Sequence, residues 1–255
     1  MFRGRLSFVR TAAVAAAGAS CLAAAACGGI TASSLSAVPV ASRTPDPLAS
    51  LTAYKVAAEA LADLKAASSL TMAGTATQSG TSVTVNLRLK PGHGCAGTVE
   101  EGTEGLIKLV VIGTTVYFNP DTTFWKSTLG SEASTVTTLV NGRYIKTSTT
   151  SKGMASLASL CDLSRTMTSN ALKTGEPVSK GAFTTLGGVR VLALKQSSDD
   201  SVVYVTDTSK PEIVEVFAPK GDPGGSAKLT FSIGAPVTLT APPASQVLDG
   251  SAIGM

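Results

Sequence analysis

The feature that most constrains this 255-residue chain is an alternation of apolar and polar side chains that starts near Ser69 and returns in the last third. It is clearest at residues 82–90, where every second residue is Val or Leu. Successive side chains of a β-strand point to opposite faces, so the pattern predicts a strand with one buried and one solvated face. The apolar positions are Val83, Val85, Leu87 and Leu89.

Segments with strand character, separated by turn-forming Gly, Pro, Asp and Ser, recur along most of the chain. We expect about ten to twelve strands in antiparallel hairpins, and a sheet of that size tends to curl. The expected fold class is mainly β with α (α+β). The predicted strands cover residues 70–76, 82–90, 96–101, 106–113, 115–119, 124–126, 178–180, 189–195, 202–206, 212–217, 227–233 and 237–239.

Three segments have helical character instead. Residues 52–67 are rich in Ala, Leu, Lys and Glu and predict an amphipathic helix before the first strand. Residues 131–140 and 153–172, on either side of 144–146, are rich in Ser, Ala, Thr and Leu and predict a helical insert, with Cys161 in its second part. The expected buried stripe of the first helix is Tyr54, Ala57, Leu61, Leu64 and Ala67.

The N-terminus has the composition of a secretory signal peptide. Three arginines precede an apolar run, and small residues lead into Cys27, which Gly28 and Gly29 follow. This ending resembles the bacterial lipobox, whose cysteine becomes the first mature residue and receives a diacylglyceryl group. Ala24 departs from the lipobox, which prefers Leu there, and Cys21 is a competing acceptor. An unlipidated or uncleaved signal is the remaining alternative.

Lipidation at Cys27 predicts a mature chain anchored on the extracytoplasmic face of the cell membrane. A single acyl chain binds reversibly, whereas the two chains of a diacylglyceryl group give stable attachment. No second apolar run approaches the roughly 20 residues of a membrane-spanning helix. We expect a signal peptide at 1–26, a flexible tether at 27–50, one domain at 51–246 and a tail at 247–255.

Net charge argues against nucleic acid as a partner. The chain carries +4, but three of its 21 basic residues are the arginines of the signal peptide, which contains no acidic residue. The mature chain therefore has 18 basic and 17 acidic side chains and a charge near +1. That balance gives no electrostatic basis for binding a phosphate backbone.

Cys95 and Cys161 are the other two cysteines, and export would place them in an oxidising compartment. There they are expected to form a disulfide. The alternative is a pair of free, buried thiols. A metal site is not expected, because His93 is the only histidine and neither cysteine has neighbouring ligands at a usable spacing.

Between about residue 50 and residue 245 the chain carries several short structural motifs: Ile112-Gly113, Val116-Tyr117, Pro120, Phe124-Trp125-Lys126, Gly187-Gly188-Val189, Leu229-Thr230-Phe231-Ser232, Pro236-Val237-Thr238-Leu239 and Pro242-Pro243. Their order resembles the LolA/LolB-like lipoproteins of actinobacteria, in particular the LppX/LprG group of lipid-binding lipoproteins. The resemblance implies a strongly curved antiparallel half-barrel with an N-terminal helix and a helical insert. In that family the sheet and helices enclose an apolar cavity, which in some members carries acylated lipids or glycolipids.

The resemblance therefore implies a lipoprotein that binds or carries an acylated lipid or glycolipid in the cell envelope. The apolar strand faces form a ligand site only where curvature leaves volume that side chains do not fill. The alternative is a sensory or protein-binding lipoprotein on the same scaffold with a filled interior. The predicted cavity residues are Val83, Val85, Leu87, Val203, Val205, Leu229 and Phe231.

The groups that carry catalysis in other proteins have simpler interpretations here. His93 lies in a Pro-Gly-His-Gly turn, without the flanking aspartate or serine elbow of a triad. Glu100-Glu101 and Asp199-Asp200 are interpreted as exposed charges, and residues 221–225 lack the lysine of a phosphate loop. We expect neither enzyme activity nor a cofactor, and we expect Trp125 to be a core residue rather than a ligand platform.

Overall fold

The computed structural model describes residues 46–78, 80–151, 153–162, 177–197, 200–219 and 225–253. All of them belong to a unit that comprises residues 44–255, whereas residues 1–43 fall in another unit. Cys27 and the predicted signal peptide lie outside the described residues. Within the described part of the chain, no helix combines the length and apolar character needed to cross a bilayer.

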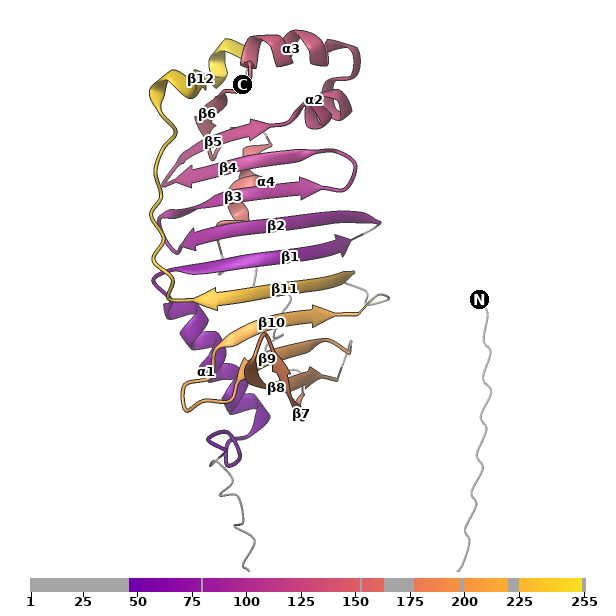
Figure 1. Ribbon diagram of the computed structural model, residues 1–255, viewed down its shortest axis with the longest axis vertical. Helices are drawn as coiled ribbons and strands as arrows, with labels where there is room; N and C mark the ends of the chain where they lie inside the picture. The colour runs from indigo at the N-terminus through magenta and orange to yellow at the C-terminus, as the bar shows by residue number, and fades with distance from the viewer. Residues whose placement is uncertain are drawn as a thin grey trace, which may run out of the picture. The chain divides into compact units, whose positions relative to one another are not determined.

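The described residues form one sheet of twelve strands, built from two meanders (Figure 1). Strands β1–β6 follow one another across one half, and β7–β11 fill the other half in reverse, so that β11 pairs with β1. The strands are β1 (Leu70–Gln78), β2 (Thr81–Lys90), β3 (Gly94–Glu101), β4 (Leu106–Ile112), β5 (Thr115–Pro120), β6 (Tyr144–Ser148), β7 (Val178–Leu186), β8 (Val189–Gln196), β9 (Val202–Thr206), β10 (Ile213–Ala218), β11 (Ser226–Ile233) and β12 (Val247–Asp249).

The mainly β, curved sheet with a few helices is the predicted architecture, but its last strand differs from the prediction. Residues 237–239, expected to be a strand, have no strand pairing. The connection at 234–246 contains three prolines, which cannot donate to a ladder, and it runs along the strand ends (Figure 1). Val247–Asp249, expected in the tail, pairs instead as β12, and its pairing with β6 is parallel. The sheet is therefore mixed rather than purely antiparallel.

The predicted first helix is α1 (Ala53–Ala66), and the Thr52 hydroxyl caps it by accepting the Lys55 N–H at 3.2 Å. Its predicted buried stripe is partly wrong, because Tyr54 is 63% exposed. Alanines occupy several sides of this helix, so the apolar pattern determined its rotation only weakly. The residues that α1 buries are Val56, Ala57, Ala60 and Leu64.

The predicted strand piece at 124–126 is wrong, since these residues lie in α2 (Thr122–Leu129). Pro120 ends β5, and the Asp121 carboxylate then accepts the Phe124 N–H at 2.8 Å, which starts a helix. Trp125 is 7% exposed, and its ring meets that of Phe124 edge to face with centroids 5.5 Å apart. Trp125 is therefore a core residue, as expected.

The helical insert is present as α3 (Ala133–Val140) and α4 (Met154–Ser159). Helix α4 is shorter than predicted within the described residues, and Cys161 lies just beyond its end rather than inside it. Residues 163–176 lie outside the described part of the chain. The described residues also contain three short 3-10 turns: Gly130–Glu132, Ala244–Gln246 and Gly250–Ile253.

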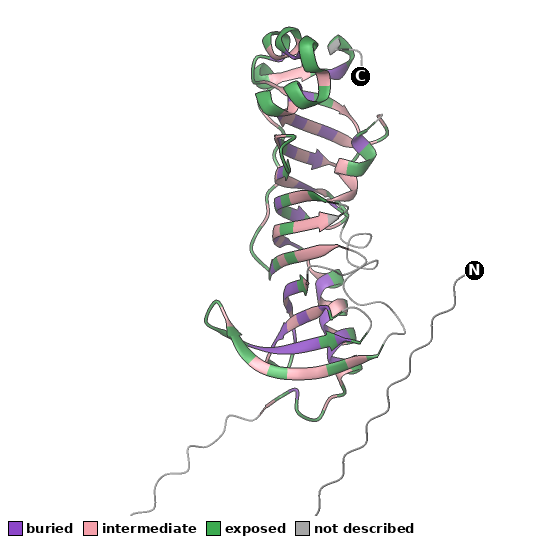
Figure 2. Cartoon of the chain, turned by 90° about the vertical axis from the view of Figure 1, so that its right-hand side faces the viewer, coloured by how far each residue is buried: buried purple, intermediate pink, exposed green. Residues whose placement is uncertain are grey.

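The core lies on one face of the sheet, which we call the inner face and define by Val85, Leu87 and Leu89 of β2. The opposite residues Thr84 and Asn86 are exposed, and Figure 2 shows the same alternation along neighbouring strands. The strand register extends the inner face into cross-strand rows. One row is Val216, Leu229, Gly74, Val85, Val99 and Ile107; the next is Phe231, Met72, Leu87, Gly97 and Leu109.

The core begins earlier than the predicted domain boundary. Leu48 is 0% exposed, in a turn at 47–50 that the sequence assigned to the tether. The Lys180 ammonium of β7 donates hydrogen bonds to the carbonyls of Leu48 and Ala49. Residues 46–50 are therefore part of the folded unit.

Two strand glycines occupy the middle of the inner face. Gly74 has φ +146° and Gly97 has φ +157°, and a Cβ on Gly97 would collide with the Asn86 carbonyl oxygen. Glycine within a strand permits such close approach of neighbouring backbones and allows the sheet to bend. These positions therefore require glycine.

Gly97→Ala should lower the free energy of unfolding by about 1–3 kcal/mol, because the added methyl group forces β2 and β3 apart or strains the backbone. Urea denaturation measures the change. Thr98→Ala, at the next residue on the opposite face, is the matched control and should change stability by less than about 0.5 kcal/mol. Equal effects of the two substitutions would contradict the steric requirement at Gly97.

Candidate ligand-binding site

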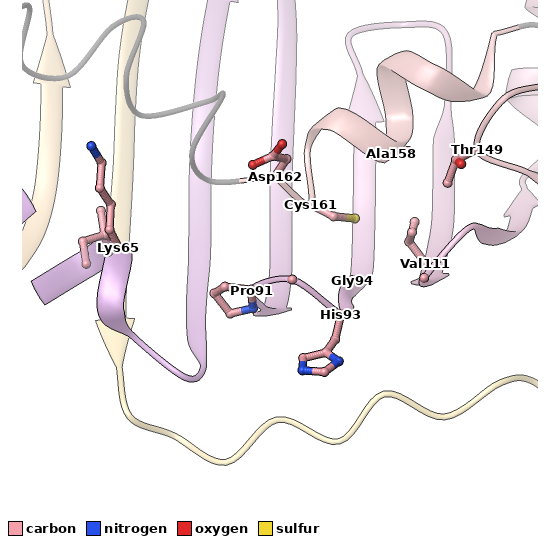
Figure 3. A pocket seen from close by; sticks show the side chains of 12 residues that line it. Lys65, Pro91, His93, Gly94, Val111, Thr149, Ala158, Cys161 and Asp162 are labelled. Carbon is pink, nitrogen blue, oxygen red and sulfur yellow. The ribbon is translucent and has the colours of Figure 1, made fainter. Parts of the chain in front are cut away.

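A hollow of about 520 Å³ lies at one end of the strands, on the inner face (Figure 3). Five segments border it: the C-terminus of α1, the β2–β3 turn, the end of β4, the turn after β6 and the end of α4. Leu64, Val111 and Ala158 provide apolar lining from three of these elements. The floor of the hollow is therefore continuous with the apolar core.

Backbone hydrogen bonds fix the rim of the hollow at the β2–β3 turn. The His93 N–H donates to the Lys90 carbonyl at 2.9 Å and closes the turn. The His93 carbonyl then accepts the Gly113 N–H at 2.8 Å, which ties this turn to the β4–β5 turn. The side of the hollow formed by the sheet is thus held by main-chain contacts.

The predicted disulfide between Cys95 and Cys161 is present and forms part of the hollow's wall. It joins Cα atoms 5.2 Å apart across a sequence separation of 66 residues. Cys95 belongs to the inner face of β3, opposite Leu89 in the register, and Cys161 follows α4. The disulfide therefore attaches the β6–β7 connection, which contains the second part of the predicted helical insert, to the inner face.

Charged groups occupy the exposed part of the rim. Lys65 of α1, His93 and Asp162 are all exposed, and Figure 3 shows their side chains pointing in different directions. They do not converge as an acid–base pair. The arrangement offers an apolar floor beside a polar rim.

A second hollow, of about 430 Å³, shares Gly92, His93 and Gly113 with the first. Its other lining includes Ile112 of β4 and Leu239 of the connection before β12. His93, expected to be a solvated turn residue, is an exposed turn residue and also borders both hollows. The β2–β3 turn therefore lies between two concave surfaces.

The seven predicted cavity residues all lie on the inner face, as the alternation of apolar and polar residues in their strands predicts. Five are buried and two are partly buried, and none of the seven borders either hollow. Their role as a cavity wall stays a prediction. The buried five are Val85, Leu87, Val203, Val205 and Phe231; the partly buried two are Val83 and Leu229.

The residues that border the hollow were missed because they come from helix ends and turns. Leu64 was predicted to be buried but not to line a site, and Ala158 carries no pattern of its own. The signal that pointed to this place was the Cys95 to Cys161 pairing, since it fixes which insert residues meet which strand end. The sequence predicted this pairing but not a site beside it.

The other candidate groups do not assemble into a further site in the described residues. Glu100, Glu101 and Asp200 are exposed, while Asp199 and residues 221–224 lie outside the described part of the chain. Over the ranges described, no cluster of three His, Cys, Asp or Glu side chains is arranged to hold a metal ion.

No known protein family matches this sequence, and no curated protein matches it. Among solved structures, an uncharacterized conserved protein from Thermus thermophilus aligns with a TM-score of 0.35 and 11% identity, over 77% of this chain and 98% of that chain. A LolA superfamily protein from Nitrosomonas europaea aligns with a TM-score of 0.25 and 10% identity, over 75% of this chain and 98% of its own. Similarity this low assigns no function, so the LppX/LprG grouping stays a prediction.

Removing the disulfide should lower the free energy of unfolding by up to about 4 kcal/mol, because a loop of this length then becomes unrestrained in the unfolded chain. The test is urea denaturation of the Cys95→Ala/Cys161→Ala variant against the oxidised chain. A reductant should destabilise the original chain and leave the variant unchanged. Equal stability of the oxidised chain and the variant would contradict the role of the disulfide.

Proposed function

We propose that this chain is a lipid-anchored protein of the cell envelope that binds an acylated ligand, a lipid or glycolipid, in the hollow beside the disulfide. The observation that carries the proposal is the apolar inner face, which continues into an open hollow between α1, α4 and the strand ends. Such a site needs no catalytic group. It shields acyl chains from water, and the burial of apolar surface supplies the free energy of binding.

The size and polarity of the hollow support this proposal. Its volume of about 520 Å³ lies within the range of about 300–1,000 Å³ that small-molecule sites occupy. Leu64, Val111 and Ala158 would contact the apolar part of the ligand, and the exposed Lys65 and His93 lie where a polar headgroup would reach solvent. An amphiphile satisfies both surfaces, whereas a wholly polar ligand would leave the apolar floor uncovered.

The proposed anchor keeps the hollow near a membrane. Residues 28–45 separate Cys27 from Asp46, the first described residue. A chain of this length spans at most about 60 Å when extended and about 25 Å on average when flexible. The folded unit would therefore stay within a few tens of ångströms of the bilayer, where acylated ligands are found.

The anchor is tested by Cys27→Ser, which removes the thiol that would accept the diacylglyceryl group. We expect this variant to leave the membrane fraction for the soluble fraction, because no acyl chains then bind the bilayer. Cell fractionation followed by intact-mass measurement reads out both location and modification. Cys21→Ser is the matched control and should remain membrane-bound with an acylated residue 27. Unchanged fractionation of Cys27→Ser would contradict the anchor.

The ligand site is tested on two alanines of α4. Ala158 borders the hollow, whereas Ala155 is exposed on the same helix and does not border it. Ala158→Trp should fill the hollow and abolish lipid co-purification, while Ala155→Trp should retain it. The measurement is mass spectrometry of the organic extract after native purification, with lipid counted per protein molecule and melting temperature as the folding control.

Three outcomes would count against the acylated ligand or its place. A lipid-free original chain that crosslinks to a polypeptide partner would favour the protein-binding alternative. Equal lipid loss in both tryptophan variants, with unchanged melting temperature, would mean that lipid binding does not depend on the hollow beside Ala158. Full lipid occupancy in Ala158→Trp would place the ligand elsewhere on the inner face.

A further inference from the structure

The outer face of the sheet, opposite the apolar core, carries a cluster of cations over strands β2–β6. Each of these basic residues directly follows a buried inner-face residue in its strand, so its side chain points to the outer face. All of them are exposed, and none forms a salt bridge with a described residue. We call this surface the basic face and define it by Arg88, Lys90, Lys108 and Lys146.

The basic face has an excess of positive charge. In the described strands β2–β6 and β12, the acidic residues on the outer face are Glu100 and Asp249, against four cations. The mature chain as a whole is nearly neutral, so its charges are unevenly distributed over the surface. Such a local excess attracts an anionic partner even when the net charge is small.

The cations are spread over an area and do not converge on one point. The register places Arg88 and Lys146 in one cross-strand row, which passes through Ala96, Val110 and Tyr117. This row crosses four strand spacings, or about 19 Å. Lys108 lies in the neighbouring row, opposite Thr98 and Asn119. A single small anion contacts only one part of such a surface, whereas an extended anionic surface contacts all of it.

We propose that the basic face docks on the headgroups of an anionic lipid bilayer. Each lysine or arginine near such a bilayer strengthens binding about fivefold. Lysine is depleted from protein–protein interfaces, and three of the four cations here are lysines. Tyr117, half-buried in the row between Arg88 and Lys146, is of a residue type enriched where membranes meet water. Charge complementarity and composition thus favour a bilayer over an acidic protein.

A polar recess of about 260 Å³ lies at the β6 end of the basic face. Lys146 borders it, and ammonium and hydroxyl groups are donors that phosphate oxygens accept. Asp249 also borders the recess, but its Oδ1 already accepts the Ser251 N–H at 3.0 Å and the Ser251 hydroxyl at 2.7 Å. The recess would receive one lipid headgroup at this edge. Its hydroxyl lining is Thr114, Thr115, Thr147, Ser148 and Ser251.

Docking in this way would bring the β2–β3 turn near the headgroups. Lys90 ends β2 and borders the second hollow, and His93 borders both hollows. The basic face is therefore continuous with the rim of the candidate ligand site. This consequence rests on the proposed function, whereas the docking itself rests only on the charges of the basic face.

The test is lysine footprinting of the full chain on vesicles, with a water-soluble acetylating reagent and peptide mass spectrometry. The vesicles contain either phosphatidylcholine alone or an equimolar mixture with phosphatidylglycerol. Lys90, Lys108 and Lys146 report the basic face, whereas Lys55 of α1 and Lys210, which pairs with Asp63 of α1, report the side of that helix. We expect acetylation of the first three to fall severalfold on the anionic vesicles and that of the other two to stay unchanged. High salt should abolish the difference.

Arg88→Gln/Lys108→Gln removes two cations and leaves Lys146 as a reporter. The vesicle concentration that half-protects Lys146 should rise roughly 25-fold, or about fivefold for each cation removed. The matched control is Lys55→Gln/Lys210→Gln, which removes the same charge from the side of α1 and should keep the original protection. Melting temperatures of both variants serve as the folding control.

Three results would overturn the proposal. The first is equal acetylation of Lys108 and Lys146 on the two kinds of vesicle. The second is unchanged protection of Lys146 in Arg88→Gln/Lys108→Gln. The third is protection by polyglutamate and not by anionic vesicles, which would mean that the basic face binds an acidic protein. Sedimentation with the neutral vesicles reports the proposed lipid anchor separately, so a failure of the anchor is distinguishable from a failure of the docking.

Discussion

The antiparallel pairing of β1 with β11 is the interaction on which the rest of the structure depends. It joins two meanders into one sheet, so that β6 lies near one edge and β7 forms the other. The connection from β6 to β7 must therefore pass from one half of the sheet to the other. Its helix α4 packs on the inner face, and the disulfide from Cys161 to Cys95 of β3 fixes it there. Sheet topology and covalent chemistry thus determine what covers the apolar face.

The way in which helices cover the apolar face also explains why the hollow lies at the strand ends. A sheet with one apolar face must bury it against another layer, and the described cover consists of short helices. Helix α1 packs mainly against β7 and β10, whereas α4 is held beside β3. Leu64 of α1 and Ala158 of α4 both border the hollow, together with the β2–β3 turn.

Local alternation predicted the strands well, because a register error would move every apolar side chain of a strand to the wrong face. The alternation pattern gave a wrong prediction, or none, where other features determined the structure. At 124–126 the aromatic residues favoured a strand, but Pro120 and the Asp121 cap started a helix. Strand β12 has only three residues and a parallel partner far away in sequence, so no local pattern marks it. The hollow likewise joins residues that only the topology brings together.

Helix α1 connects the start of the folded unit with the hollow. The buried Leu48 lies in the turn that precedes its N-terminus, and Leu64 and Lys65 of its last turn border the hollow. A helix of 14 residues is about 21 Å long. Because α1 packs on β7 and β10, its position on these strands determines where one wall of the hollow lies.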